Sequence, residues 1–278
     1  FCAYCIIPYA RGPVRSLSLE QAVEQTRQLA DAGYREIVVN GIEISSWGAE
    51  WKDGSTLSEL LTAICTAAPQ VRIRLGSLEP RTVTEEFCRA LAGFQNLCPQ
   101  FHLSLQSGSD TVLSRMHRKY DTARYAESVR LLHEYFPGCA VTTDLIVGFP
   151  GETEEEFGES LAFVSRCGIS MFHIFPYSRR SGTPAAKMPD QIPRSVKETR
   201  AARAAQVAAA LEEGYHEALR GSVQQVLFEQ LEDGLWAGHA MNYVKVYLKD
   251  DCDLNNHILP VRVTELCRDG VLGERVSE

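Results

Sequence analysis

The sequence lacks the features that mark a membrane or secreted protein. None of its apolar runs approaches the roughly 20 residues that a membrane-spanning helix requires, and the chain does not open on a basic segment followed by an apolar one. It also lacks paired cysteines: the nine cysteines are odd in number and scattered, and only Cys2 and Cys5 lie close together. This usage is typical of a reducing compartment, so we expect a cytoplasmic protein without membrane association or a disulfide framework.

An excess of positive charge is also absent. The chain carries 28 Lys and Arg against 36 Asp and Glu, a formal net charge of −8. Phosphate affinity depends on clustered Lys and Arg, so this balance argues against a protein that binds nucleic acid over its whole surface. The composition is otherwise that of a soluble globular protein, and 278 residues suffice for one barrel-sized domain or for a large domain with a small one.

The first three-quarters of the chain alternates short β-branched runs with amphipathic stretches, the pattern of repeated βα units. Helix-start signals stand at Ser18, Thr84 and Thr153. Parallel strands joined by helices predict an α/β barrel or doubly wound sheet with its chemistry at the carboxyl ends of the strands. The predicted strands are residues 36–40, 71–75, 101–105, 140–147 and 170–175.

The last quarter has a different texture. An Ala- and Glu-rich stretch predicts one long connecting helix over residues 195–215. Beyond Gly221 alternating strands separated by turn signals predict a small antiparallel β-barrel. We therefore expect two domains, residues 1–214 and 215–278.

The cysteine pair at the start, Cys2-Ala3-Tyr4-Cys5, is ambiguous alone, because such a pair serves half a zinc site, a redox pair or no function. A thioredoxin-like pair should open a helix, whereas Pro8 and Gly12 follow here. A second pair that would complete a zinc site is missing from the sequence. Thiolates in a loop that hold an iron–sulfur cluster remain an option.

The wider sequence resembles the radical S-adenosylmethionine (SAM) methylthiotransferase family. CAYC followed by IIPYARGPVRS resembles the end of that family's CxxxCxxC loop. Within the family, IIPYARG, TTDLIVGFPGE and FPYSRRSGTPAA resemble the branch that methylthiolates threonylcarbamoyladenosine in tRNA, and the last domain is similar to a TRAM domain, the family's RNA-binding module. The further matching stretches are RIRLGSLEP, HLSLQSGSD, RMHRKY, GHAMNYVKVYL and VRVTELCRDGVLGE.

The resemblance implies a partial (β/α)6 barrel followed by a TRAM barrel. It implies a four-iron four-sulfur cluster, held here by Cys2 and Cys5, that cleaves SAM to a radical, a second cluster that supplies sulfur, and an external reductant. The family's first cysteine would precede Phe1, as would the first barrel strand. We therefore expect an N-terminally truncated chain that is inactive as it stands.

Polar residues that follow the predicted strands are candidates for SAM binding, because carboxyl ends of parallel strands meet at one edge. Each has a plain structural alternative, a turn or a polar cap. Asp144 lies inside a strand, where an apolar residue would pack better, and Arg118 would bind either the SAM carboxylate or an RNA phosphate. Phe175 would stack on adenine or belong to the core. The full predicted SAM set is Tyr4, Gly41, Glu43, Ser77, Glu79, Gln106, Ser107, Arg118, Asp144 and Phe175.

A few residues are candidates for RNA contact. Arg179 and Arg180 follow the last strand, and Arg200 belongs to an Arg/Lys stripe at residues 194, 197, 200 and 203 of the long helix, which would face either RNA or solvent. In the small barrel Trp236, Tyr243 and Tyr247 would stack on bases or fill the core. The other seven cysteines are interpreted as buried small hydrophobes.

The sequence thus predicts a tRNA methylthiotransferase acting on threonylcarbamoyladenosine next to the anticodon. Methylthiolation of a ribosomal protein by the same mechanism is the nearest alternative. A non-catalytic RNA-binding fragment and a barrel hydrolase with Glu79 and Asp144 as acid and base are alternatives of other classes. The oligomeric state and the catalytic residues stay open.

Overall fold

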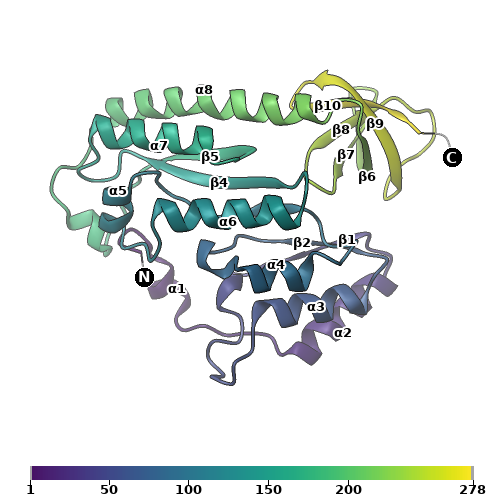
Figure 1. Ribbon diagram of the computed structural model, residues 1–278, viewed down its shortest axis with the longest axis horizontal. Helices are drawn as coiled ribbons and strands as arrows, with labels where there is room; N and C mark the ends of the chain where they lie inside the picture. The colour runs from purple at the N-terminus through teal and green to yellow at the C-terminus, as the bar shows by residue number, and fades with distance from the viewer. Residues whose placement is uncertain (1, 277–278) are drawn as a thin grey trace.

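The computed structural model describes residues 2–276, and its elements follow the predicted alternation (Figure 1). Helices begin where polar caps stand: Ser18 caps α2 and Thr153 caps α7 in complete capping boxes, and Thr84 accepts from the Phe87 amide at the start of α4. The helices are α1 (Ile7–Arg11), α2 (Leu19–Asp31), α3 (Leu57–Ala67), α4 (Glu85–Leu91), α5 (Asp110–Arg115), α6 (Thr122–Tyr135), α7 (Glu154–Arg166) and α8 (Arg194–Ala218), with short 3-10 turns η1 (Ile44–Ser46), η2 (Pro80–Thr82) and η3 (Pro184–Lys187).

All five predicted strands of the first domain form, and they are parallel. β1 (Glu36–Val39) pairs with β2 (Arg72–Leu75), and β3 (Gln100–His102), β4 (Ala140–Val147) and β5 (Met171–Pro176) form a second ladder. Isolated bridges between residues 73 and 97 and between residues 78 and 103 link the two groups. The strands therefore follow one another in chain order around a partial barrel with helices on its outside.

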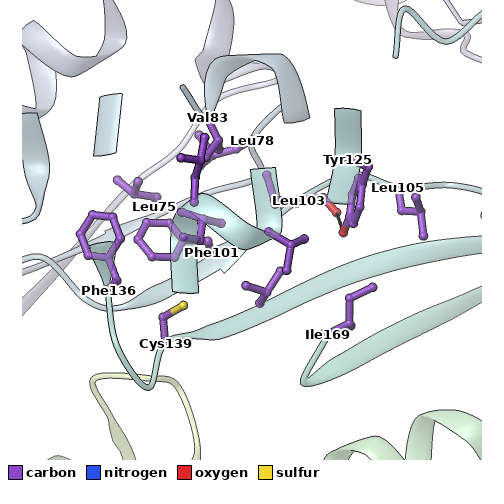
Figure 2. Packing of buried hydrophobic residues seen from close by; sticks show 14 of the residues in the cluster. Leu75, Leu78, Val83, Phe101, Leu103, Leu105, Tyr125, Phe136, Cys139 and Ile169 are labelled. Carbon is purple, nitrogen blue, oxygen red and sulfur yellow. Dashed lines mark hydrogen bonds between the residues drawn. The ribbon is translucent and has the colours of Figure 1, made fainter. Parts of the chain in front are cut away.

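The hydrophobic core lies between this sheet and its helices. Phe101 and Leu103 on β3 and its extension, with Leu75 at the end of β2, meet the helix residues Tyr125 and Phe136, all of them buried (Figure 2). Alternate strand residues point to the opposite, concave face, because side-chain direction reverses at each step along a strand. The concave face is therefore the polar one, and it is where the chemistry-bearing residues collect.

The last quarter forms the predicted barrel, with one difference in topology. β6 (Val223–Glu232), β7 (Leu235–Ala240), β8 (Lys245–Leu248), β9 (Ile258–Cys267) and β10 (Gly270–Arg275) close in the order β10-β8-β7-β6-β9. β10 pairs antiparallel with β9 on one side and parallel with β8 on the other, and the β10–β8 pairing closes the barrel. The expectation of a wholly antiparallel barrel is therefore wrong. The predicted domain boundary at residue 214 falls within α8.

Two arginines of β2 fasten the small barrel to the partial barrel. Arg72 donates to the carbonyl oxygens of Gln225 (2.6 Å) and His239 (3.2 Å), and Arg74 donates to that of Met241 (3.0 Å). Arg74 also forms a two-pronged ion pair with Glu36 on β1, at 2.6 and 2.9 Å. Both guanidinium groups are almost fully buried, so the two domains share a polar joint rather than a flexible linker.

Among the described residues, we find no helix that combines the length and the apolar character needed to span a membrane.

Candidate cofactor site

The cysteine pair sits in a loop that two distant segments hold in place. The buried Ala3 donates its amide to the carbonyl of Met116 at the end of α5 (2.9 Å) and accepts from the amide of Ala185 in η3 (2.8 Å). The Cys5 amide donates back to the Cys2 carbonyl at 3.2 Å. The loop between the two thiols is therefore fixed by main-chain bonds, with both cysteines free and half-buried.

Arg118 aims its guanidinium at the first thiol. Its Nη1 lies 2.8 Å from Cys2 Sγ, Nε donates to the Tyr120 hydroxyl at 2.8 Å, and Nη2 reaches the carbonyl of Ser104 at 3.4 Å. Tyr120 in turn donates to the carbonyls of Ser104 and Leu105, just beyond β3. Arg118, which is held by Tyr120 and by the Ser104 carbonyl, thus presents one N–H to Cys2 Sγ at the carboxyl end of β3.

Tyr4, between the two cysteines, points away from solvent. Its ring packs edge-on against Phe149 at a centroid distance of 6.2 Å, in a small cluster with Tyr177. Burial, reinforced by nearby Cys2, raises the pKa of Tyr4 well above its ordinary value, so its hydroxyl stays protonated. The Tyr177 hydroxyl is buried without a hydrogen-bond partner in the described chain, so this otherwise apolar cluster contains an unpaired polar atom.

The donor set fits an iron–sulfur cluster in part. Two half-buried thiols lie in a fixed loop and one of them already accepts a charged hydrogen bond, an arrangement suited to sulfur-ligated iron. Within residues 2–276 we find no group of three His, Cys, Asp or Glu side chains placed to hold a metal ion. The described residues therefore offer two thiolates, and no complete metal site of their own.

The predicted SAM-binding residues on the first two strands lie where β1 and β2 end. Gly41, Glu43 and Ser77 are exposed there. Glu79 is half-buried and already engaged: its amide donates to Ser45 Oγ (2.9 Å) and its carboxylate accepts from Arg81 (2.8 Å). These strand ends form a polar rim, and among the described residues no hydrogen bond or ion pair joins them to the cysteine loop.

Gln106 and Ser107, the two predicted SAM-binding residues that follow β3, lie in different environments. Gln106 is buried with a left-handed backbone (φ 71°) and pairs with β4, its amide donating to the Asp144 carbonyl at 2.9 Å. Ser107 is fully buried against α7, where its hydroxyl lies 3.1 Å from that of Ser160. The prediction that Ser107 binds SAM is corrected, because its hydroxyl forms the contact between the loop and α7 and does not reach the concave face.

Asp144 and Phe175 lie on the concave face. Asp144 Oδ2 is 3.4 Å from His102 Nε2, and His102 Nδ1 is 3.1 Å from Thr142 Oγ1. Phe175 on β5 is half exposed, so it is not a core residue. His173, two residues before Phe175 on the same face, is exposed and does not belong to the predicted site set. A partial signal is present in the sequence, because Gln100 and His102 on β3 and Thr142 and Asp144 on β4 stand at alternate positions and share this face.

The residues predicted to contact RNA differ in their exposure to solvent. Arg179 and Arg180 are exposed, and Arg179 Nε donates to the Ala186 carbonyl (2.8 Å). The prediction that Arg200 contacts RNA is corrected, because Arg200 is buried and its Nη1 donates to the carboxylate of Glu152 at 2.8 Å. The rest of its stripe is also engaged, because Lys197 donates to the Tyr177 carbonyl and residues 194 and 203 pair with glutamates. Lys197, Arg200 and Arg203 thus join α8 to the partial barrel, whereas Arg194 is 90% exposed and pairs with Glu198 on its own helix.

The aromatic candidates of the small barrel also differ from one another. Tyr247 is buried, and its hydroxyl donates to Asp269 at 2.5 Å. Tyr243 is half exposed with φ 71°, and its ring stacks with His239 at 4.8 Å and meets the Arg74 guanidinium at 4.7 Å. Of the remaining cysteines Cys252 is exposed, against the expectation of burial, because it follows β8 in a loop.

Sequence comparison places these features in a known setting. The family model for the radical SAM superfamily matches residues 1–164. Similar curated proteins include the threonylcarbamoyladenosine tRNA methylthiotransferase MtaB of Bacillus subtilis, 40% identical over 95% of this chain and 59% of its own length. The tRNA-2-methylthio-N(6)-dimethylallyladenosine synthase of Acetivibrio thermocellus is 34% identical over 95% of this chain and 55% of its own. The chain thus spans little more than half the length of these relatives.

Solved structures with the same fold are more distant in sequence. The radical SAM methyltransferase TsrM from Kitasatospora setae superposes with a TM-score of 0.56 at 20% identity, over 66% of this chain and 34% of its own. Methylornithine synthase gives 0.52 at 15% identity, over 74% and 58%. At these identities the likeness concerns the fold alone. With the superfamily match over more than half of the sequence, and with the cysteine loop at the edge of a partial parallel barrel, this chain belongs to the radical SAM superfamily.

Proposed function

We propose that this chain is the core and RNA-binding part of a tRNA methylthiotransferase that adds a methylthio group to the adenine ring of threonylcarbamoyladenosine, in the cytoplasm. The observation that carries the proposal is the extent of the similarity. The tRNA-modifying relatives match 95% of the chain, through the partial barrel and the small barrel alike. The small barrel is also fastened to the partial barrel by Arg72 and Arg74, so an RNA held by one domain is presented to the other.

Each residue of the cofactor site has a separate task in this function. When bound, a four-iron four-sulfur cluster and SAM supply the one-electron chemistry of the superfamily. Cys2 and Cys5 would ligate iron, and Arg118 orients Cys2 through its hydrogen bond while Tyr120 holds Arg118. Tyr4 and the cluster around Phe149 exclude water behind the loop. The exposed ends of β1 and β2, with Gly41, Glu43 and Ser77, offer polar groups to SAM.

The alternative functions find less support. A hydrolase would need Glu79 and Asp144 as a cooperating pair, but Glu79 is paired with Arg81 and Asp144 with His102. A ribosomal-protein substrate would leave the small barrel without a nucleic-acid partner. The external reductant and tRNA itself belong to the proposal as partners.

Iron analysis tests the cofactor part. After anaerobic reconstitution of the protein expressed from its complete gene we expect iron and sulfide in the unaltered protein and a clear loss in Cys5→Ser, whereas Cys252→Ser, which alters an exposed cysteine remote in sequence, should keep the unaltered content. Equal iron in all three proteins would refute the assignment of the cysteine pair.

Nucleoside analysis tests the substrate. Mass spectrometry of tRNA from a strain lacking the gene should show threonylcarbamoyladenosine without its methylthio group, and complementation should restore it. Unchanged methylthio-threonylcarbamoyladenosine in the deletion strain would defeat the proposed substrate.

A further inference from the structure

The charges of this chain are distributed unevenly along the sequence. Residues 1–12, 111–120 and 171–189 contain seven of the 28 Lys and Arg but none of the 36 Asp and Glu. The acidic excess of the chain therefore lies entirely outside these three segments. A protein with a net charge of −8 can thus still carry a local positive field, and such a field attracts an anionic partner.

The three segments meet at the cysteine loop. Ala3 bonds through its main chain to Met116 on one side (2.9 Å) and to Ala185 on the other (2.8 Å). In Figure 1, α1, α5 and the segment that follows β5 accordingly lie together, at the end of the molecule away from the small barrel.

Most of the cations on these segments are free. Arg115 pairs with Glu156 and Arg118 donates to Cys2, but the other five are exposed and have no ion-pair partner within residues 2–276. We call these five residues the basic rim: Arg11, Lys119, Arg179, Arg180 and Lys187.

The loop that carries two of the rim arginines is held in a fixed shape. The amide and the hydroxyl of Thr183 both donate to the Arg180 carbonyl, at 3.2 and 2.8 Å, and close a turn. Arg179 donates its Nε to the Ala186 carbonyl at 2.8 Å, which orients the guanidinium, and its Nη groups have no hydrogen-bond partner among the described residues. An oriented guanidinium loses little freedom when it binds a phosphate through two parallel hydrogen bonds.

The small barrel offers less free positive charge. Residues 223–275 contain five Lys and Arg against nine Asp and Glu. Three of the five, Lys245, Arg268 and Arg275, form ion pairs within the barrel, which leaves Lys249 and Arg262. The attraction for a polyanion should therefore be stronger at the basic rim than at the domain that resembles an RNA-binding module.

We propose that the basic rim binds phosphate groups of the RNA substrate beside the cysteine loop, and that it supplies more of the salt-dependent affinity than the small barrel does. Phosphates recur at every nucleotide, so a strand that brings one base to the cofactor site carries the neighbouring phosphates past the rim. Three of the five cations are arginines, whose planar fork matches a phosphate. The inference rests on the proposed function, because an acidic protein would meet the same charges.

The salt dependence of RNA binding tests the proposal. Fluorescence anisotropy of an anticodon stem-loop RNA, with protein expressed from the complete gene, gives the association constant between about 50 and 200 mM KCl. Its logarithm falls with the logarithm of the salt concentration, by a slope of about 0.7 for each phosphate contact on a single strand. Arg11→Gln combined with Lys187→Gln should lower this slope by about 1.4 and weaken binding by at least about tenfold at the lowest salt.

The matched control removes the same charge from the small barrel. Lys249→Gln combined with Arg262→Gln should change the slope less than the rim variant does. Circular dichroism and thermal melting should be unchanged in both double variants, because all four side chains are exposed.

An unchanged slope in the rim variant, or a larger loss in the barrel variant, overturns the proposed phosphate site and leaves the proposed function standing. A rim variant that keeps its RNA affinity but whose cluster is reduced more slowly by an acidic flavin carrier protein also overturns it, because the surface would then serve a protein partner. If RNA binding depends on the rim while a deletion strain keeps its methylthio-threonylcarbamoyladenosine, the phosphate site stands and the proposed substrate fails.

Discussion

The buried pair of Arg200 and Glu152 makes the sharpest prediction, because the sequence suggests an RNA contact where the structure shows a structural one. Glu152 accepts from the Gly148 amide (2.6 Å) and from Arg200 Nη1 (2.8 Å), and both side chains are nearly inaccessible to solvent. Arg200→Met would leave a buried carboxylate with one partner. Breaking such a pair from one side costs about 3 kcal/mol of unfolding free energy.

The pH dependence gives the prediction its signature. Burial already raises the pKa of Glu152, against the opposing effects of the Gly148 amide and Arg200, so removing Arg200 raises it further. A carboxyl whose folded-state pKa lies above its unfolded value stabilises the fold below the unfolded pKa and loses that contribution as pH rises through the folded pKa. The penalty of Arg200→Met should therefore grow with pH, by up to about 1.4 kcal/mol per unit.

Urea denaturation followed by circular dichroism, in steps from about pH 4.5, near the unfolded pKa of a glutamate, up to pH 8, measures this penalty. Arg194→Met is the matched control: it lies on the same helix, its side chain is 90% exposed, and its solvent-screened pair with Glu198 should contribute little to stability. RNA affinity at a temperature where both variants are folded should fall in Arg180→Met and stay unchanged in Arg200→Met. A pH-independent loss no larger than that of the control, or RNA binding impaired more than in Arg180→Met, would refute the reasoning.

Three further predictions concern other contacts. Arg74→Met should speed limited proteolysis between the domains and lower the free energy of unfolding by about 3 kcal/mol, because Glu36 loses its ion-pair partner and the Met241 carbonyl loses its donor. An unchanged digestion rate would contradict the proposal that Arg74 holds the two domains together. The hydrogen bond from Arg115 lowers the pKa of Glu156 to about 2, so stability from this group should be lost as pH falls from about 4.5 towards 2, and Glu156→Gln should flatten an acid-denaturation curve there. Gly108→Ala should cost about 1–3 kcal/mol in a thermal melt, since its new methyl would stand 2.8 Å from Ser160 Cα; a neutral result would show that α7 yields.

The sequence predicts the elements better than it predicts their partners. The run at residues 140–147 is reproduced as β4 because, apart from Asp144, its residues are apolar or threonine and suit a buried parallel strand. The ladder of β3 ends at His102, short of the predicted Leu105, since the following residues bend towards the left-handed Gln106. Local patterns fix such elements, whereas the end of a ladder depends on a neighbouring strand that the pattern does not contain.

The site shows the same limit. Cys2 and Arg118 meet although 116 residues separate them, and spacing alone cannot supply that contact. On α8, Arg200 and Arg203 turn towards Glu152, just before α7, and Glu154, in the first turn of α7, and the helical spacing of the stripe does not contain these partners. Arg72 and Arg74 were missed as a joint, yet two arginines at alternate positions of a short apolar strand were a signal that one face meets polar groups.

The joint between the domains also bears on how freely the small barrel can change. The hydrogen bonds from Arg72 and Arg74 to the small barrel end on main-chain oxygens, those of residues 225, 239, 240 and 241. Side chains at these positions can therefore be exchanged without removing an acceptor. A barrel of different sequence but the same backbone path would keep these acceptors for Arg72 and Arg74, so the outer side chains of this domain can be exchanged on an unaltered partial barrel.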